Sequence, residues 1–461
     1  MKFNRKTSLR LGISIPLFLI VALSIISGCN NSDLPPIISS VQSTPPDFSK
    51  PIILESFSPD SGGVGTQLVL KGQNFGTDSN YLYVTVNDKK AKIVGVKNDY
   101  IYAVVPARAD TGYVRLYVGQ GDNVEEYALD KPFRYKFKRN VTTLAGKDQE
   151  NGRIDGDYGE ARLQRPWFLL ADKDDAMYFI DEGRGTDKNG ALRRAREDLI
   201  ETLVQCSAGP FQSPTCLAFS QNEDTLYITN KSSHEVTTDV NILYCTRAGG
   251  FVDTKPFVYM KGAQTQGIAV NPKTGEVFFD SQTDGYIYRY TGTGKTATQE
   301  DTPYEQLFRI SGSSNVEMRM LFSQDGSTLY VVIRNRHCIY KINYDTETRT
   351  FGVPEMFAGL WGESGYANGV GTGARFNWPG QPALDEDGNL FVPDKDNHCI
   401  RKITPQGEVS LYAGKGTEAG YKDGTPDRAR FRGPEAVVFL SDGAMYVADR
   451  DNHCIRRVVV E

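Results

Sequence analysis

The sequence predicts an all-β protein that consists of a small sandwich followed by an array of repeated β-sheets. Residues 51–137 contain short runs of β-branched and aromatic residues separated by Gly, Asn, Asp and Pro, a pattern typical of strands and turns. From residue 141 onward, short phrases of sequence recur, and such repetition is typical of solenoids and propellers. The 461 residues include 24 Tyr and 23 Phe, which supply apolar surface for a core and argue against disorder.

The N-terminus has the pattern of a secretory signal over residues 1–28. Four Lys and Arg residues lie among the first ten, an uncharged apolar stretch follows at 11–26, and small residues precede Cys29. The stretch is short for a membrane-spanning helix, which needs about 20 residues. Residues 26–29, Ile-Ser-Gly-Cys, resemble a bacterial lipobox, and this implies that Cys29 becomes the acylated first residue. The alternative is an ordinary signal peptide in which Cys29 has no such role.

The polar, proline-rich segment 29–50 is expected to act as an extended tether. Asp33, close behind Cys29, resembles the surface-export signal of lipoproteins from the Bacteroidetes. This resemblance implies a lipid anchor in the outer membrane, with the protein facing outward at the cell surface and touching the membrane through its lipid only.

Residues 51–137 are expected to form one small β-domain. Strands are expected at 68–70, 82–86, 100–105 and 113–118, spaced as in a sandwich. The segment resembles the immunoglobulin-like IPT/TIG family at residues 57–59, 61–63, 65–66, 71–76 and 105–106. The resemblance implies that this domain acts mainly as a spacer.

Three sets of phrases define the later repeat. The phrase around Ala-Arg-Phe-x-x-Pro occurs at 373–379 and 428–434, with a related copy at 160–166. A Gly-x-hydrophobic phrase ending in Asp occurs at 388–394 and 443–449, and an Asn-His-Cys-Ile phrase occurs at 396–403 and 451–458. A degenerate copy of the last phrase lies at 335–342. These phrases resemble the NHL repeat, which implies four-stranded blades of a β-propeller.

Six blades are expected from their innermost strands, which begin near Pro166, Pro214, Thr265, Glu317, Pro379 and Pro434. The last blade lacks a fourth strand, whereas an extra strand at 141–145 precedes the first blade. We expect this N-terminal strand to complete the sixth blade, because closing the ring removes an exposed sheet edge. The prediction is therefore a six-bladed NHL-type propeller over residues 141–461.

Composition argues against a nucleic-acid partner. The chain has 52 Lys and Arg residues against 57 Asp and Glu residues, a formal net charge of −5. No global basic field attracts phosphate, so a polyanion such as DNA or RNA is not expected to bind.

The histidine and cysteine pattern indicates structural residues. A His-Cys pair occupies the same repeat position in three blades, at Cys338, Cys399 and Cys454. Equivalent positions of different blades lie too far apart to share a zinc ion, so no metal site is expected there. The sequence leaves open whether two of three further cysteines form a disulfide, namely Cys206, Cys216 and Cys245.

The starts of the innermost strands, which line the pore, provide a test for an enzyme. Propeller enzymes of related kinds place metal-binding histidines or several carboxylates there. In this chain these positions contain no His, and only Glu435, with Glu317 one residue upstream in its own blade, is acidic. The sequence therefore assigns no catalytic residue, no metal and no cofactor. The alternative is a metal-dependent hydrolase or lyase that uses these two carboxylates.

The long loops before three innermost strands favour a binding protein. The loops 146–165, 359–378 and 414–433 carry aromatic and arginine residues, which suit sugar rings and their hydroxyl groups. The architecture resembles lipoproteins of glycan-utilisation systems, which implies non-catalytic binding of a glycan or glycoconjugate, with an outer-membrane transporter as a further partner. A protein–protein scaffold in an uptake complex is a third hypothesis. The candidate ligand-binding residues are Trp167, Trp361, Trp378, Arg319, Gln266, Tyr366, Tyr421 and Glu435.

Overall fold

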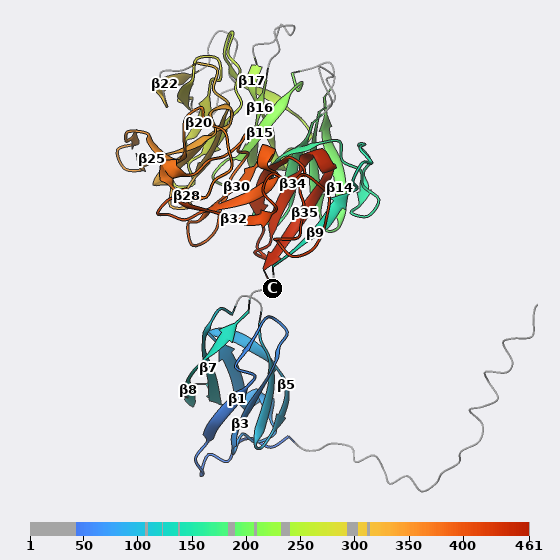
Figure 1. The fold of residues 1–461 in the computed structure, drawn as a ribbon, viewed down its shortest axis with the longest axis vertical. Coiled ribbons are helices and arrows are strands. Elements are labelled where there is room, and N and C mark those ends of the chain that lie inside the picture. The colour runs from blue at the N-terminus through green and yellow to red at the C-terminus, as the bar shows by residue number, and fades with distance from the viewer. Residues whose placement is uncertain are drawn as a thin grey trace, which may run out of the picture. The chain divides into compact units, whose positions relative to one another are not determined.

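The computed structural model describes residues 43–106, 109–121, 123–136, 139–182, 190–206, 210–231, 240–292, 303–310 and 314–460 (Figure 1). The predicted signal segment, Cys29 and most of the predicted tether lie outside these residues. Contacts divide the chain into two compact units, a sandwich and a propeller, which are described separately below. Among the described residues, no helix is long and apolar enough to cross a membrane.

The N-terminal unit is a β-sandwich whose strands follow the order β1-β3-β6-β5-β4-β7-β8-β2. Strand β5 turns the corner between the two layers, because its first residues pair with β4 and its last residues pair with β6. Side chains alternate between core and solvent along β3, where Leu68 and Leu70 are fully buried. The strands are β1 (Ile53–Ser58), β2 (Ser61–Gly62), β3 (Gln67–Gln73), β4 (Leu82–Val86), β5 (Lys89–Lys97), β6 (Tyr100–Val104), β7 (Gly112–Gln120) and β8 (Asn123–Tyr135).

The second unit contains six antiparallel sheets, one for each blade of a propeller. The first blade contains β10 (Gly156–Asp157), β11 (Pro166–Ala171), β12 (Met177–Asp181), β13 (Ala191–Arg196) and β14 (Leu199–Gln205). The second contains β15 (Pro214–Phe219), β16 (Thr225–Asn230), β17 (Val240–Thr246) and β18 (Lys255–Tyr259). The third contains β19 (Ile268–Val270), β20 (Val277–Asp280), β21 (Tyr286–Tyr290) and β22 (Tyr304–Arg309).

The remaining three blades are built in the same way, and the short β28 (Gly369–Val370) of the fifth blade pairs with the outer strand of that blade. The fourth contains β23 (Met318–Phe322), β24 (Thr328–Ile333), β25 (Cys338–Asp345), β26 (Thr350–Phe351) and β27 (Glu355–Gly359). The fifth contains β28 (Gly369–Val370), β29 (Ala383–Leu384), β30 (Leu390–Asp394), β31 (Cys399–Ile403) and β32 (Glu408–Gly414). The sixth contains β33 (Pro434–Phe439), β34 (Met445–Asp449), β35 (Cys454–Val460) and β9 (Arg139–Gly146). The all-β fold and the six blades predicted from the sequence are thus confirmed.

The sixth blade is closed by the N-terminal strand, as predicted. Strand β9 pairs antiparallel with β35, with Val141 opposite Val458 and Gly146 opposite Cys454 (Figure 1). Val141 is fully buried, so the closing strand contributes to the core as well as to the sheet. This pairing covers the edge of β35 that would otherwise be exposed.

The histidines of the repeated His-Cys phrase join each blade to the next. The ring nitrogen Nδ1 of His337 accepts a hydrogen bond from the backbone N–H of Trp378 at 3.1 Å, and that of His398 accepts from Gly433 at 3.2 Å. The cysteine that follows each of these histidines is fully buried. Both residue types therefore stabilise the ring, as the sequence predicted.

None of the six described cysteines forms a disulfide. Cys206, Cys216 and Cys245, for which the sequence left a disulfide open, are buried free thiols. Burial raises the pKa of the Cys216 thiol to about 12, so this group stays protonated and unreactive at neutral pH.

Candidate ligand site at the pore mouth

The innermost strands of the six blades run in the same direction, so their first residues meet at one end of the central channel. The second residues of β11, β23 and β33 are Trp167, Arg319 and Glu435. Strands β24 and β34 run the opposite way and end at the same place, where Arg334 and Arg450 follow them. We refer to these five residues as the pore-mouth cluster.

Short 3-10 turns place the basic residues of this cluster. In the last three blades the second strand is followed by such a turn, and each turn begins with a basic residue, namely Arg334, Lys395 and Arg450. Each lies three residues before the histidine of the His-Cys phrase. Arg334 and Arg450 were not predicted from the sequence, although this repeated basic position was a signal that could have found them.

Trp167 lies at the centre of the cluster, with three arginines over its ring. The guanidinium carbons of Arg450, Arg334 and Arg319 lie 4.7, 4.9 and 5.7 Å from the ring centroid. Such cation–π contacts contribute roughly 0.5–2 kcal/mol each. The indole Nε1 of Trp167 is buried and makes no hydrogen bond to another described residue. Trp167 is therefore a partly exposed ring surrounded by guanidinium groups, and its Nε1 is a donor without a described partner.

Arg334 forms ion pairs with two carboxylates, one inside the pore-mouth cluster and one beside it. Its guanidinium forms an ion pair with Glu435 and a second one with Glu317 at 3.3 Å. Burial lowers the pKa of Arg334 and raises that of Glu435, while each group opposes the shift of the other. Arg334 and Glu435 are each 1% exposed, so removing either would leave an uncompensated buried charge.

Arg450, another cation of the cluster, forms ion pairs with two carboxylates that lie outside the cluster. It pairs with Glu182 at 2.7 Å and with Asp451 at 3.0 Å. Burial lowers the pKa of Arg450, but Glu182 and Glu435 outweigh this effect and raise it overall.

Arg319 differs from the other two arginines because no described carboxylate lies within ion-pair distance of it, although Asp280 and Glu435 interact with it electrostatically. Its Nη1 donates to the backbone oxygens of Met318 at 2.9 Å and Gln266 at 3.2 Å. Within the described part of the chain, Arg319 forms no ion pair, and its buried Nη2 has no hydrogen-bond partner. Gln266 itself is buried, and its side-chain Nε2 donates a hydrogen bond to Gln282. It positions Arg319 through its backbone oxygen and not through its side chain.

Trp378 adopts a strained backbone conformation beside the cluster. Its φ of 53° lies in the left-handed region, where the next blade has Gly433 with a φ of 59°. The ring of Trp378 lies 5.9 Å from the guanidinium carbon of Arg334. A tryptophan at a position that suits glycine is strained, and strain of this kind is concentrated at functional sites.

The structure thus brings five of the eight predicted residues to the pore mouth and places the other three elsewhere. Trp361, Tyr366 and Tyr421 lie over third strands of their blades, not over innermost strands. Trp361 packs against Tyr340 of β25, Tyr366 lies over Arg401 of β31, and Tyr421 lies over Arg456 of β35. The residues that meet at the pore mouth are Trp167, Arg319, Gln266, Trp378 and Glu435.

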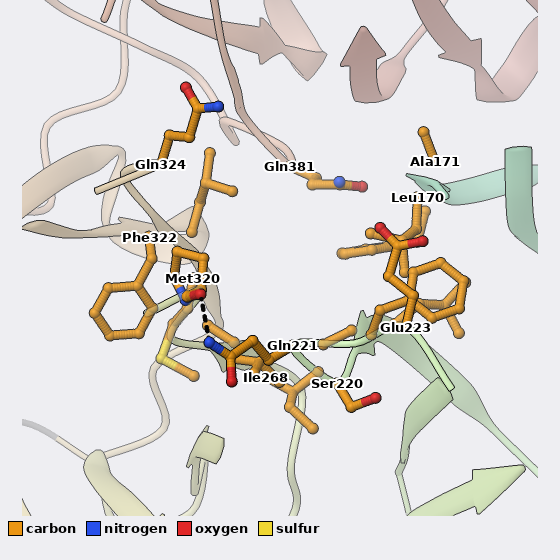
Figure 2. A pocket seen from close by; sticks show the side chains of 18 of the residues that line it. Leu170, Ala171, Ser220, Gln221, Glu223, Ile268, Met320, Phe322, Gln324 and Gln381 are labelled. Carbon is orange, nitrogen blue, oxygen red and sulfur yellow. Dashed lines mark hydrogen bonds between the residues drawn. The ribbon is translucent and has the colours of Figure 1, made fainter. Parts of the chain in front are cut away.

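The opposite end of the channel contains a cavity of about 330 Å³ (Figure 2). Its wall consists mainly of apolar side chains, such as Leu170, Ile268 and Met320. Glu223, which also lines it, pairs with Arg247 at 3.4 Å. The residues that line this cavity include no comparable group of buried donors without a described partner, so we place the candidate site at the pore mouth.

Gln381 bridges the channel between the two ends. It belongs to the fifth blade, yet its side-chain amide donates to the backbone oxygen of Leu169 in the first blade at 2.7 Å. The N–H of Leu169 donates back to its amide oxygen at 3.0 Å. The preceding Gly380 lets the chain pass close to the sixth blade, because a Cβ there would lie 2.1 Å from the backbone oxygen of Glu435.

The carboxylates at the pore mouth do not fit a divalent cation. Glu317 and Glu435 converge, but they converge on the guanidinium of Arg334. Among the described residues, no group of three or more His, Cys, Asp or Glu side chains is arranged to hold a metal ion. A hard cation usually takes several oxygen ligands, and here an arginine occupies the position between them.

Comparison with family profiles identifies both kinds of domain. Residues 51–135 match the IPT/TIG domain, and residues 431–458 match the NHL repeat. Among curated proteins, NHL repeat-containing protein 2 of Gallus gallus is 33% identical over 85 residues, which is 18% of this chain and 11% of that protein. Protein SUPPRESSOR OF QUENCHING 1 of Arabidopsis thaliana is 33% identical over 92 residues, 20% of this chain and 9% of that protein. These relatives share only a small part of their length with this chain.

Solved structures match nearly the whole chain. An auxiliary nutrient binding protein from Bacteroides thetaiotaomicron is 27% identical, with a TM-score of 0.63, over 90% of this chain and 99% of that one. A second, from Bacteroides ovatus, is 26% identical, with a TM-score of 0.63, over 91% and 100%. A candidate phosphatase from Bacteroides thetaiotaomicron is 25% identical, with a TM-score of 0.64, over 90% and 98%.

Proposed function

We propose that this protein binds a nutrient, a glycan or glycoconjugate, at the pore mouth of its propeller and does not transform it. The observation that carries the proposal is the similarity to two solved nutrient-binding proteins, at 27% and 26% identity, across both units of the chain. The similarity extends over 90% or more of this chain, so it includes the sandwich and the ring together.

The chemistry of the pore-mouth cluster supports a sugar ligand. The partly exposed ring of Trp167 suits the apolar face of a pyranose. Around it lie a buried donor on Arg319 and a buried acceptor on Glu435 that have no partner among the described residues. Few, well-placed polar groups around an aromatic platform are typical of small-ligand sites.

We further propose that Cys29 carries a lipid that anchors the protein to the outer membrane, with the propeller at the cell surface. Residues 26–29 and the proline-rich tether behind them support this location. The IPT/TIG domain would then act as a spacer between membrane and propeller. A transporter in the same membrane would receive the captured nutrient.

A glycan panel with matched tryptophan variants tests the binding function. Trp167→Ala is expected to weaken binding of the best glycan at least tenfold. Truncating an aromatic side chain that anchors a ligand typically costs about 2 kcal/mol or more of binding free energy. Trp361→Ala removes a tryptophan that packs over a third strand and should change affinity less than twofold. Equal losses in both variants, or no binding by any member of the panel, would contradict the proposal.

The second candidate function is hydrolysis, because a candidate phosphatase is among the similar structures. A hydrolase that used Glu317 and Glu435 would need these carboxylates free, but both pair with Arg334. We expect no turnover of p-nitrophenyl phosphate with Mg²⁺, Mn²⁺ or Zn²⁺ added. Turnover that Glu435→Gln abolishes would establish the enzyme instead.

A further inference from the structure

We propose that the ligand of the pore mouth is acidic, with a carboxylate or sulfate group that binds the guanidinium of Arg319. This inference rests on the proposed function and names the class of glycan that the site selects.

Arg319 is the one arginine of the pore-mouth cluster that forms no ion pair among the described residues, although Asp280 and Glu435 act on it electrostatically. Arg334 is neutralised by Glu435 and Glu317, and Arg450 is neutralised by Glu182 and Asp451. No described carboxylate forms an ion pair with Arg319, although its side chain is only 1% exposed. A buried charge is costly unless it is paired, so Arg319 is prepared for an anion that comes from outside the chain.

Asp280, a buried carboxylate of the adjoining blade, interacts electrostatically with Arg319 but forms no ion pair with it among the described residues. Its Oδ1 instead accepts hydrogen bonds from the backbone N–H groups of Gln266 and Gly267, both at 2.7 Å, and these hydrogen bonds and Arg319 oppose the effect of burial on its pKa. Burial raises the pKa of Asp280 to about 7, so a large fraction of this group is neutral at physiological pH.

The unused hydrogen-bonding groups complement an acidic sugar. Arg319 Nη2 and Trp167 Nε1 are donors without a described partner, and the two side chains lie together, with 5.7 Å between guanidinium carbon and ring centroid. A sugar ring stacked on Trp167 would place an acidic substituent next to Arg319. Glu435 Oε2, also unpartnered, suits a hydroxyl group of the same sugar, and the ion pair with Arg334 limits its repulsion of the acidic group.

The inference is tested with two matched pairs of oligosaccharides. One pair is tetragalacturonate and its methyl ester, and the other is a sulfated galactan tetramer and its desulfated form. Affinities are measured by calorimetry at pH 7.5 in 20 mM and 150 mM NaCl. We expect the acidic member of at least one pair to bind tenfold or more tightly than its neutral counterpart, and the two pairs distinguish a carboxylate from a sulfate ligand.

Substitution of Arg319 assigns the preference to this residue. Arg319→Met keeps most of the side-chain volume and is expected to reduce the preference for the acidic member to less than threefold. Arg319→Lys should retain part of it. The control Arg196→Met removes an exposed arginine that pairs with Glu197 on the outer part of the first blade, and it should leave all affinities unchanged.

Two outcomes overturn the inference in distinguishable ways. If neutral and acidic members bind equally well, or if Arg319→Met keeps the preference, the inference fails while glycan binding stands. If no member of either pair and no other glycan binds, the proposed function fails as well. Should Arg319→Met not fold, inorganic sulfate at 10 mM provides the test in the unsubstituted protein, because it must weaken binding of the acidic member and spare the neutral one.

Discussion

Arg334 and Trp167 belong to the fourth and the first blades, yet the guanidinium carbon of one lies 4.9 Å from the ring centroid of the other. This contact spans the mouth of the channel. Because Arg334 also pairs with Glu435 of the sixth blade, three blades meet at one guanidinium. The pore mouth is therefore crossed by a buried network of charged side chains that joins three blades.

Breaking the buried ion pair should destabilise the ring. Glu435→Gln leaves Arg334 with only the partial compensation of Glu317, so the free energy of unfolding should fall by about 3 kcal/mol. Urea denaturation at pH 7.5 measures this change. The control is Glu201→Gln, which removes a partly exposed partner of Arg194 and should cost less than about 1 kcal/mol. Similar losses in the two variants would contradict the central role of the buried pair.

Trp378→Gly should weaken glycan binding while it leaves the thermal stability of the protein nearly unchanged. Glycine adopts a φ of 53° without strain, and the relief of about 1–2 kcal/mol offsets the packing that the indole loses. We expect the midpoint of thermal unfolding to stay within a few degrees of the unsubstituted protein, while glycan affinity falls at least fivefold. A large drop in thermal stability together with unchanged affinity would show that Trp378 is a packing residue.

Strand β9, which closes the sixth blade, should contribute to the free energy of unfolding of the whole propeller. Val141→Ala creates a cavity under β9 at a fully buried position and should lower the free energy of unfolding by about 1–3 kcal/mol. Val353→Ala changes a valine that is 81% exposed and should have almost no effect. Urea denaturation of both variants checks this, and a neutral result for Val141→Ala would mean that β9 is not an integral part of the sixth blade.

Asp280 should give the stability a specific pH dependence. In the folded state burial raises its pKa from 3.8 to about 7, so the unfolded chain releases this proton first as the pH rises. The contribution of Asp280 is fully present below about pH 4 and is lost as the pH rises toward 7. Asp280→Asn cannot lose a proton, so its free energy of unfolding relative to the unsubstituted protein should increase between pH 5 and pH 8, by an amount on the order of a few kcal/mol.

A second aspartate provides the control for this pH dependence. Hydrogen bonds from Ser323 and Ser327 lower the pKa of Asp325, so its contribution is lost only in acid, below about pH 4. The difference between Asp325→Asn and the unsubstituted protein should therefore stay constant between pH 5 and pH 8. A constant difference for Asp280→Asn as well would contradict the raised pKa of Asp280.

The sequence predicted those parts of the structure that local repetition controls. The phrase at 141–146 matches the outermost strands of later blades, and this match was sufficient to predict the pairing of β9 with β35. The His-Cys phrase likewise indicated structural residues, because one repeat position cannot assemble a metal site across several blades.

The site was only partly predictable, because its contacts join residues that are far apart in the chain. Trp167 and Glu435 were candidates, but Arg334, which holds both together, was not. Trp361, Tyr366 and Tyr421 share the long loops with Trp378 or its counterparts, yet they cover third strands. Which side of a loop faces the channel depends on the packing of neighbouring blades, and one sequence does not reveal that.

A crystal structure of the protein with its best-binding oligosaccharide would test the assignment of the ligand site at the pore mouth. We predict a sugar ring stacked on Trp167, with an acidic group within hydrogen-bond distance of Arg319. A ligand bound instead in the cavity around Leu170 and Met320, or on the loops beside Tyr366 and Tyr421, would contradict it.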